Sequence, residues 1–197
     1  MGAQDTMIRL SDETYEYIKN EVIHLITLYD IKCMPISAFE LASKMNIAVI
    51  PYSCLTEQTR KLFLKISQDG FSYNNYIRLQ ESIYYNDEVS YDRRNMTILH
   101  EIGHIALGHK INLESNEIEC LKSETEAKFF AKYAAAPPPL VHKLRPKCPE
   151  DIEEAFNISF EAACYAYNYY CKWLIQFNRK GGYKDYENKL LCHASKG

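Results

Sequence analysis

Two histidines and a glutamate stand in the middle of an otherwise apolar run, TILHEIGHIALGH, which extends from Thr97 to His109. Residues four apart on a helix lie one above the other, so His100 and His104 can present two imidazole nitrogens to one metal ion. Glu101 follows the first histidine directly, which places its carboxylate beside the ion. There it can accept a proton from a water molecule whose pKa the ion lowers to about 7. This is the HExxH pattern of zinc-dependent peptidases.

The sequence around the motif predicts one enclosed helix. Ser90 can cap a helix that starts at Tyr91, and we expect it to run to Leu107 and to end at Gly108, since glycine is the usual stop signal. Isoleucine and leucine cover the other faces, so the helix should be surrounded by protein. An unpaired buried polar group costs roughly 1–3 kcal/mol, and metal binding compensates for that cost. Gly103 should let another segment approach the helix closely.

A catalytic zinc site holds three protein ligands and leaves the fourth position to water, so one more ligand is needed. The segment EIECLKSETEAKFFAKYAAAPPP predicts a second helix that carries Glu124 and Glu126 near its start. Glu124 shares the packing face of Ala127 and Ala131, whereas Glu126 lies about 200° round the helix from it. Only one of the two can face the zinc helix. We expect Glu124 to be the third ligand and Glu126 to be solvated or to support the site from outside.

Four further residues are weaker candidates. His109 follows the terminal glycine of the zinc helix, where a cation suits the helix dipole, and we expect it at the surface or beside the ligands. His142 comes after the proline run and could reach the cleft to stabilise an oxyanion. Tyr85 and Asn86 end the strand ahead of the zinc helix and could orient a substrate backbone by edge-strand pairing. Because strand side chains alternate between faces, one of Tyr84 and Tyr85 should pack in the core.

Both helices and strands are expected ahead of the zinc helix. Apolar residues recur at helical spacing after Ser11, and Ser37 with Glu40 can form a capping box. The run IAVIPY is typical of a strand, and GFSYNNYIRLQESIYYN has the glycine, the asparagine pair and the alternation of a hairpin. The expected elements are a helix over 12–29, a helix ending near 46, a strand over 47–52, a helix over 55–66 and a hairpin over 70–86. This order indicates an α+β fold.

The C-terminal part contains the run FNISFEAACYAYNYY, which begins at Phe156. It predicts the end of a short helix, a turn over 157–159 and a longer helix to about Phe177, in the outline of a helix-turn-helix. The second helix offers only Lys172 as a cation before its end, whereas phosphate contacts need several. We therefore expect this segment to pack or to recognise a partner protein.

The composition narrows the function classes. The net charge of −3 offers no electrostatic footprint for direct nucleic-acid binding. The apolar runs are far shorter than the roughly 20 residues of a spanning helix, and the start lacks a signal-peptide pattern, so we expect a cytoplasmic protein without membrane contact. Seven scattered cysteines without a CxxC pair predict reduced, mostly buried thiols.

The two predicted helices together resemble a known family. TILHEIGHIALGH followed by ETEAKFFAKYAAAP is similar to the ImmA/IrrE metallopeptidases, whose pattern is approximately HExGHxxxGH and then ExEAxxFAxxLLMP. YDIKCMPISAFELASKMNIAVIPY, SIYYND and FNISFEAACYAYNYY extend the resemblance over about residues 15–175. It implies a mostly helical zincin-like peptidase domain with a small antiparallel sheet, expected over 1–145. A C-terminal helical segment, expected over 146–197, would pack on it.

The resemblance also implies how the site works. His100, His104 and Glu124 would be the ligands of one zinc ion, with manganese as the alternative, and Glu101 would be the catalytic base. Where the family usually has Leu-Leu-Met-Pro, this chain has three alanines followed by three prolines, which alters the exit of the helix beside the site.

The family's activity gives the expected function. Its members cleave a helix-turn-helix repressor and so derepress genes in bacterial or mobile-element regulation. Two other classes stay open. The first is a non-catalytic metal-containing module that binds a partner, as in a repressor or toxin-antitoxin system; the second is a zinc hydrolase acting on a small amide. A structural site would be closed by a fourth protein ligand, whereas a catalytic site leaves that position to water.

Overall fold

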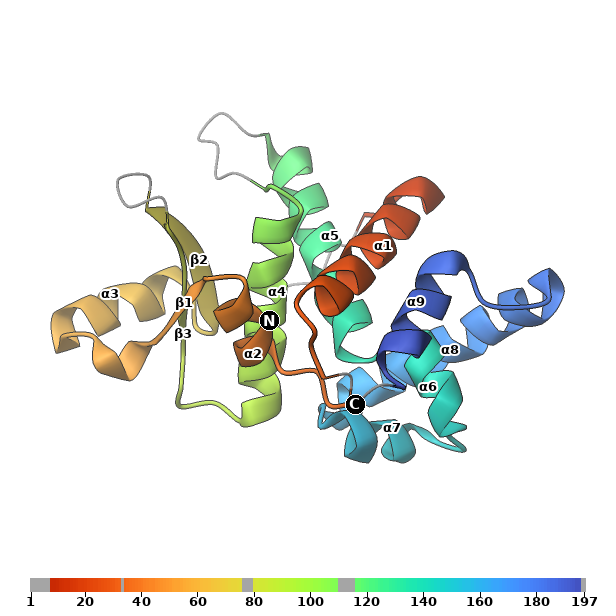
Figure 1. The fold of residues 1–197 in the computed structure, drawn as a ribbon. Helices are drawn as coiled ribbons and strands as arrows, with labels where there is room; N and C mark the ends of the chain where they lie inside the picture. The colour runs from red at the N-terminus through yellow and green to blue at the C-terminus, as the bar shows by residue number, and fades with distance from the viewer. Residues whose placement is uncertain (1–7, 33, 76–79, 110–115, 196–197) are drawn as a thin grey trace.

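The computed structural model describes residues 8–32, 34–75, 80–109 and 116–195. Most of the helices lie on one side of a small sheet, and the helix over 91–106 lies between the sheet and the helix over 117–135 (Figure 1). In chain order the elements are α1 (Asp12–Leu28), α2 (Ala38–Lys44), β1 (Ala48–Pro51), the short 3-10 helix η1 (Tyr52–Cys54), α3 (Glu57–Ile66), β2 (Gly70–Asn75), β3 (Gln80–Tyr85), α4 (Tyr91–Ala106), α5 (Glu117–Ala135), α6 (Pro138–Leu144), α7 (Pro149–Phe156), α8 (Phe160–Lys180) and α9 (Asp185–His193). The predicted mostly helical α+β class is confirmed.

Capping residues set the starts of the first two helices. The Ser11 hydroxyl accepts a hydrogen bond from the Thr14 N–H, and α1 buries an apolar stripe that includes Ile18 and Ile26. The Ser37 hydroxyl accepts one from the Glu40 N–H at the start of α2. The predictions for these two helices are therefore confirmed to within two residues at each end.

Asn95 joins α2 to α4. Its side chain is buried, accepts a hydrogen bond from the Ala38 N–H at 2.8 Å and donates one to the Ile36 carbonyl at 3.1 Å. Two backbone groups that would otherwise be unpaired at the start of α2 are thus satisfied by one amide. This polar contact fixes where α2 rests on the helix that carries the HExxH motif.

The sheet has the strand order β1-β3-β2. β2 and β3 form the predicted antiparallel hairpin, but β1 runs parallel to β3, so the sheet is mixed rather than antiparallel throughout. The reason is that β3 inserts between the other two strands, and Ile83 at its centre pairs with Val49 on one side and Ser72 on the other. The consequence is that β3 is a central strand and β2 forms the outer edge beside α4.

Two glycines allow close packing on either side of α4. A Cβ atom on Gly70 would lie 2.7 Å from the Tyr84 carbonyl oxygen and 2.8 Å from Thr97 Cγ2, so β2 can approach α4 only without a side chain there. A Cβ atom on Gly103 would lie 3.1 Å from carbon atoms of Phe130 on α5. The close approach predicted at Gly103 is confirmed. α4 is therefore held tightly between the edge strand and α5.

The C-terminal part adds elements that the sequence patterns did not predict. The turn at Asn157 and the following helix are present, although α8 continues to Lys180, three residues beyond the expected end. α6 begins within the proline run, at Pro138, and α9 packs on α1 and α6 with Leu190 buried. Within the described residues, no helix is both long and apolar enough to cross a membrane.

The cysteines correct one expectation. The described ones are free thiols, but most of them are exposed rather than buried, because they fall on outward-facing positions of their elements. Cys33 lies outside the described residues. The exposed ones are Cys54, Cys120, Cys171 and Cys192, and the half-buried ones are Cys148 and Cys164.

Candidate metal centre

α4 carries the HExxH residues on two different sides. Glu101 is buried, with 7% of its surface exposed, whereas the side chains of His100 and His104 are 21% and 16% exposed. The helix is therefore enclosed by the sheet and α5 but open along the face of the two histidines. It ends one residue earlier than expected, at Ala106. Gly108, with φ of +69°, closes it as predicted. Ser90 occupies the N-cap position without the expected side-chain hydrogen bond, so that detail is wrong.

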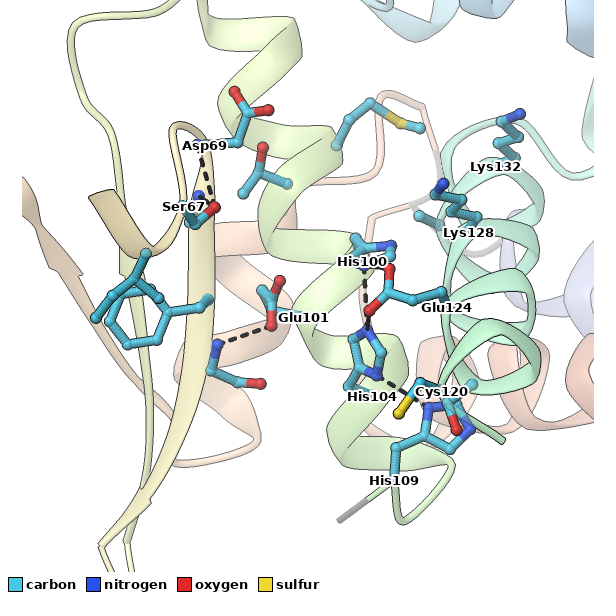
Figure 2. A pocket seen from close by; sticks show the side chains of 18 of the residues that line it. Ser67, Asp69, His100, Glu101, His104, His109, Cys120, Glu124, Lys128 and Lys132 are labelled. Atoms are coloured by element: carbon cyan, nitrogen blue, oxygen red, sulfur yellow. Dashed lines mark hydrogen bonds and ion pairs between the residues drawn. The ribbon is translucent and has the colours of Figure 1, made fainter. Parts of the chain in front are cut away.

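α5 supplies the facing wall. It starts at Glu117, the first residue of the segment that predicted it, because Asn116 and Glu119 form a capping box there. Glu124 consequently lies about two turns into the helix rather than near its start. Figure 2 shows its carboxylate pointing across to His100 and His104 on α4.

Three side chains converge on one point between α4 and α5. Nε2 of His100 and Nε2 of His104 are 3.1 Å apart. The Glu124 carboxylate spans both rings, with Oε2 at 3.4 Å from Nε2 of His100 and Oε1 at 3.3 Å from Nε2 of His104. A tetrahedral zinc ion with ligands at about 2.0–2.2 Å separates its ligand atoms by about 3.3–3.6 Å. The two distances to Glu124 lie in this range, and the distance between the two imidazole nitrogens is about 0.2 Å below it. These separations and the donor set, two imidazoles and a carboxylate, suit a zinc ion.

The electrostatics of this group keep Glu124 ionised. Side-chain contacts with His100 and then His104 hold the pKa of the carboxyl below its ordinary value of 4.5, although burial opposes this effect. A carboxylate that binds a metal ion must be deprotonated. Among the described residues, these three are the one set of histidine, cysteine and acidic side chains placed to hold an ion together.

Glu101 faces away from α5 toward β2. Its Oε2 accepts a hydrogen bond from the Ser72 backbone N–H at 2.7 Å, so the carboxylate is fixed between α4 and the edge strand (Figure 2). Gly70 allows this hydrogen bond to form, because the absence of a side chain there lets β2 lie close to α4. The sequence patterns did not reveal the role of Ser72, because nothing local shows which strand of a hairpin lies at the edge of a sheet.

His109 and Glu126 form a second set beside the ligands. Nδ1 of His109 lies 3.0 Å from Nδ1 of His104, and its Nε2 lies 2.8 Å from Oε2 of Glu126. Both side chains are mostly buried, at 12% and 15% exposure. Burial lowers the pKa of His109 despite the nearby carboxylate, which acts in the opposite direction. The structure thus places His109 against His104 and Glu126 against His109, and neither lies in solvent.

The remaining candidates lie away from this group. His142 contacts the Tyr170 hydroxyl at 2.9 Å within an aromatic cluster between α6 and α8. Tyr85 is the core tyrosine of its pair, and Asn86 donates to the Gln68 carbonyl in the turn before β2. Edge pairing by the strand that ends at Tyr85 is ruled out, because β3 is paired on both sides.

A pocket of about 720 Å³ surrounds the candidate ligands. Its walls are β2 with the preceding turn, α4 and α5, and it includes both His109 and Glu101. The residues that sequence analysis had not singled out include Arg93, Cys120, Lys128 and Lys132. Figure 2 shows the two lysines on α5, beyond Glu124 along the helix. Helical spacing from Glu124 could have identified them, since they follow it at steps of four residues.

Comparison with known families decides the relationship. The profile of the peptidase M78 family, described as the IrrE N-terminal-like domain, matches residues 52–168, more than half of the chain. The chain belongs to this family. The match confirms the resemblance to ImmA/IrrE metallopeptidases, and it spans both α4 and α5 with the His-His-Glu group. A search of curated proteins gave no match. Membership of the M78 family supports a metallopeptidase-like role with a metal ion and a protein substrate.

Proposed function

We propose that the protein is a zinc-dependent endopeptidase that cleaves a helix-turn-helix repressor and so derepresses its genes, in bacterial or mobile-element regulation. The observation that carries the proposal is the convergence of His100, His104 and Glu124 beside Glu101 in the pocket of an M78 family member. The choice of a repressor as substrate rests on the resemblance to the ImmA/IrrE family. Such a substrate would place the enzyme in the cytoplasm, where it would need no direct contact with nucleic acid.

The metal in this proposal is one zinc ion per chain, with manganese as the alternative. His100, His104 and Glu124 are the proposed ligands. Zinc accepts two imidazoles and a carboxylate, and it leaves one position open in catalytic sites. When bound, the ion would polarise the peptide carbonyl and lower the pKa of water so that it can attack.

Glu101 is the proposed general base. It accepts the proton of the attacking water and later passes it to the leaving amine. The Ser72 N–H binds Oε2, and the other carboxylate oxygen is the one proposed to accept the proton. The backbone contact holds the carboxylate in place before the substrate arrives, which reduces the cost of orienting it during the reaction.

The substrate backbone is proposed to lie along β2. Of the described strands, β1 and β2 are each paired on one side only, by β3, and β2 is the one of the two that forms a wall of the pocket. An extended peptide can add to such an edge through main-chain hydrogen bonds. The sequence suggested that the strand ending near Tyr85 pairs with the substrate backbone, and we now propose that the neighbouring strand β2 does so.

The ligand count favours catalysis over a purely structural metal site. A structural zinc site is closed by four protein ligands, whereas the described residues provide three at this position. A non-catalytic partner-binding module is the second candidate.

The division into a peptidase part over 1–145 and a packed helical segment over 146–197 also stays a proposal. Across that boundary, α8 contacts α5 and α9 contacts α1.

The decisive experiment incubates the purified, zinc-loaded protein with the repressor encoded beside it and follows the intact mass of both proteins. Glu101→Gln is the matched control, since glutamine keeps an oxygen for the Ser72 N–H but cannot take up the proton. We expect cleavage by the wild type alone, with equal zinc content in both proteins. Cleavage by the Gln variant would refute the role of Glu101. Stable binding of the repressor without cleavage would favour the non-catalytic module.

A further inference from the structure

We infer that His109 and Glu126 position His104 for metal binding through a chain of hydrogen bonds that sets which ring nitrogen carries the proton. The inference rests on the proposed function only in taking His104 as a metal ligand. It adds two positioning residues, one beyond the end of α4 and one on α5, which act on the proposed ion through His104.

The carboxylate of Glu126, which ends the chain of hydrogen bonds, determines the direction of each of them. An ionised Glu126 can only accept, so Nε2 of His109 must carry a proton and donate it across 2.8 Å. A neutral His109 then has a lone pair on Nδ1. This lone pair accepts the proton of Nδ1 of His104 across 3.0 Å. The proton of His104 is thereby kept on Nδ1, and its Nε2, which points to His100 and Glu124, is left with the lone pair that a metal ion requires.

The backbone holds this chain of groups in place. Gly108 turns the chain at the end of α4 with a positive φ, and the N–H of His109 then donates to the His104 carbonyl at 2.9 Å. His109 is therefore bound to His104 through both its backbone and its ring. Glu126 lies two residues after Glu124, so α5 provides a proposed ligand from one face and the terminal acceptor from another.

If this pair had a purely structural role, different replacements of His109 would be tolerated. If His109 only filled space, any side chain of similar size would serve, and hydrogen-bond polarity would not matter. If it sets the proton position, a replacement must accept toward His104 and donate toward Glu126. Glutamine can do both through its amide, whereas leucine of comparable size can do neither.

The first test is NMR spectroscopy of the ¹⁵N-labelled, zinc-loaded full chain. We expect Nδ1 of His104 to be protonated, Nε2 of His109 to be protonated, and a scalar coupling between the two Nδ1 nuclei across the hydrogen bond. A proton on Nδ1 of His109, or no coupling between the rings, would overturn the inference. The result depends on the wild-type protein alone, so it is obtained even where a variant fails to fold.

The second test measures zinc affinity by competition with a chromogenic chelator. His109→Leu and Glu126→Ala should bind zinc about 10- to 100-fold more weakly, the usual effect of removing a partner behind a ligand, and His109→Gln should stay near the wild type. His24→Leu removes an exposed histidine of α1 and serves as the control. Equal affinities in all folded variants would refute the inference, whether or not the repressor is cleaved. Failure to cleave with the expected affinity changes would refute only the proposed function.

Discussion

Replacing Gly70 by alanine should slow catalysis while leaving the metal site intact. The added Cβ would meet the Tyr84 carbonyl oxygen at 2.7 Å, and ordinary contacts begin at 3.4 Å, so β2 must move by about 0.7 Å. The same shift would carry the Ser72 N–H from 2.7 Å to as far as about 3.4 Å from Glu101, beyond a normal hydrogen bond. The ligands lie on α4 and α5, on the other side, and need not follow.

The size of the effect follows from the lost contact. A hydrogen bond to a charged group contributes roughly 1.5–3 kcal/mol, which corresponds to about a 10- to 150-fold fall in kcat/KM if all of it serves to orient the base. Overpacking should also lower the free energy of unfolding by about 1–3 kcal/mol. Zinc content should not change. Glu101→Gln should abolish the reaction, so the alanine variant should lie between it and the wild type.

Steady-state cleavage of a fluorogenic peptide and urea unfolding would measure the two effects. Gly181→Ala is the control, because this residue has φ of +74° with no neighbour within 4 Å, so alanine there loses about 1 kcal/mol of stability without moving β2. Adding Thr97→Ser to Gly70→Ala removes the methyl clash but leaves the backbone clash, and should restore only part of the rate. Wild-type kcat/KM in Gly70→Ala would refute the proposed role of the edge strand.

Two further predictions concern stability. Asn95→Ala leaves the Ala38 N–H and the Ile36 carbonyl unpaired, and should lower the free energy of urea unfolding by about 2–4 kcal/mol, whereas exposed Asn20→Ala should change it little. Burial alone would raise the pKa of Glu16, but hydrogen bonds from two lysines and a tyrosine outweigh it and lower the pKa to about 2. Its contribution is therefore complete above pH 4.5 and lost as the pH falls through about 2, and Glu16→Gln should weaken this acid dependence of unfolding.

Local patterns predicted the parts of the site that depend on local geometry. The i, i+4 spacing of His100 and His104 and the helical face of Glu124 require only the geometry of single helices, and the structure brings these side chains together. The place of Ser72 depends on which strand is outermost, which is decided by packing between distant segments. The contact from His109 to Glu126 likewise joins a residue beyond α4 to another helix.

The C-terminal elements show the same limit. α9 was missed because its apolar stripe is short and its partner, α1, lies at the other end of the chain. The exposed cysteines, such as Cys120, were predicted to be buried because cysteine usually is, and only the packed structure shows which positions face outward. Sequence spacing thus predicted side-chain relations within an element better than relations between elements.

The strand wall of the pocket has two roles in the proposed reaction. β2 lies tightly against α4, where a Cβ on Gly70 would meet Thr97, and its Ser72 N–H holds the Glu101 carboxylate. The unpaired edge of the same strand is where we propose that the substrate backbone binds. A peptide bound there is attached to the strand that orients the base, so the scissile bond and the base are aligned by one element.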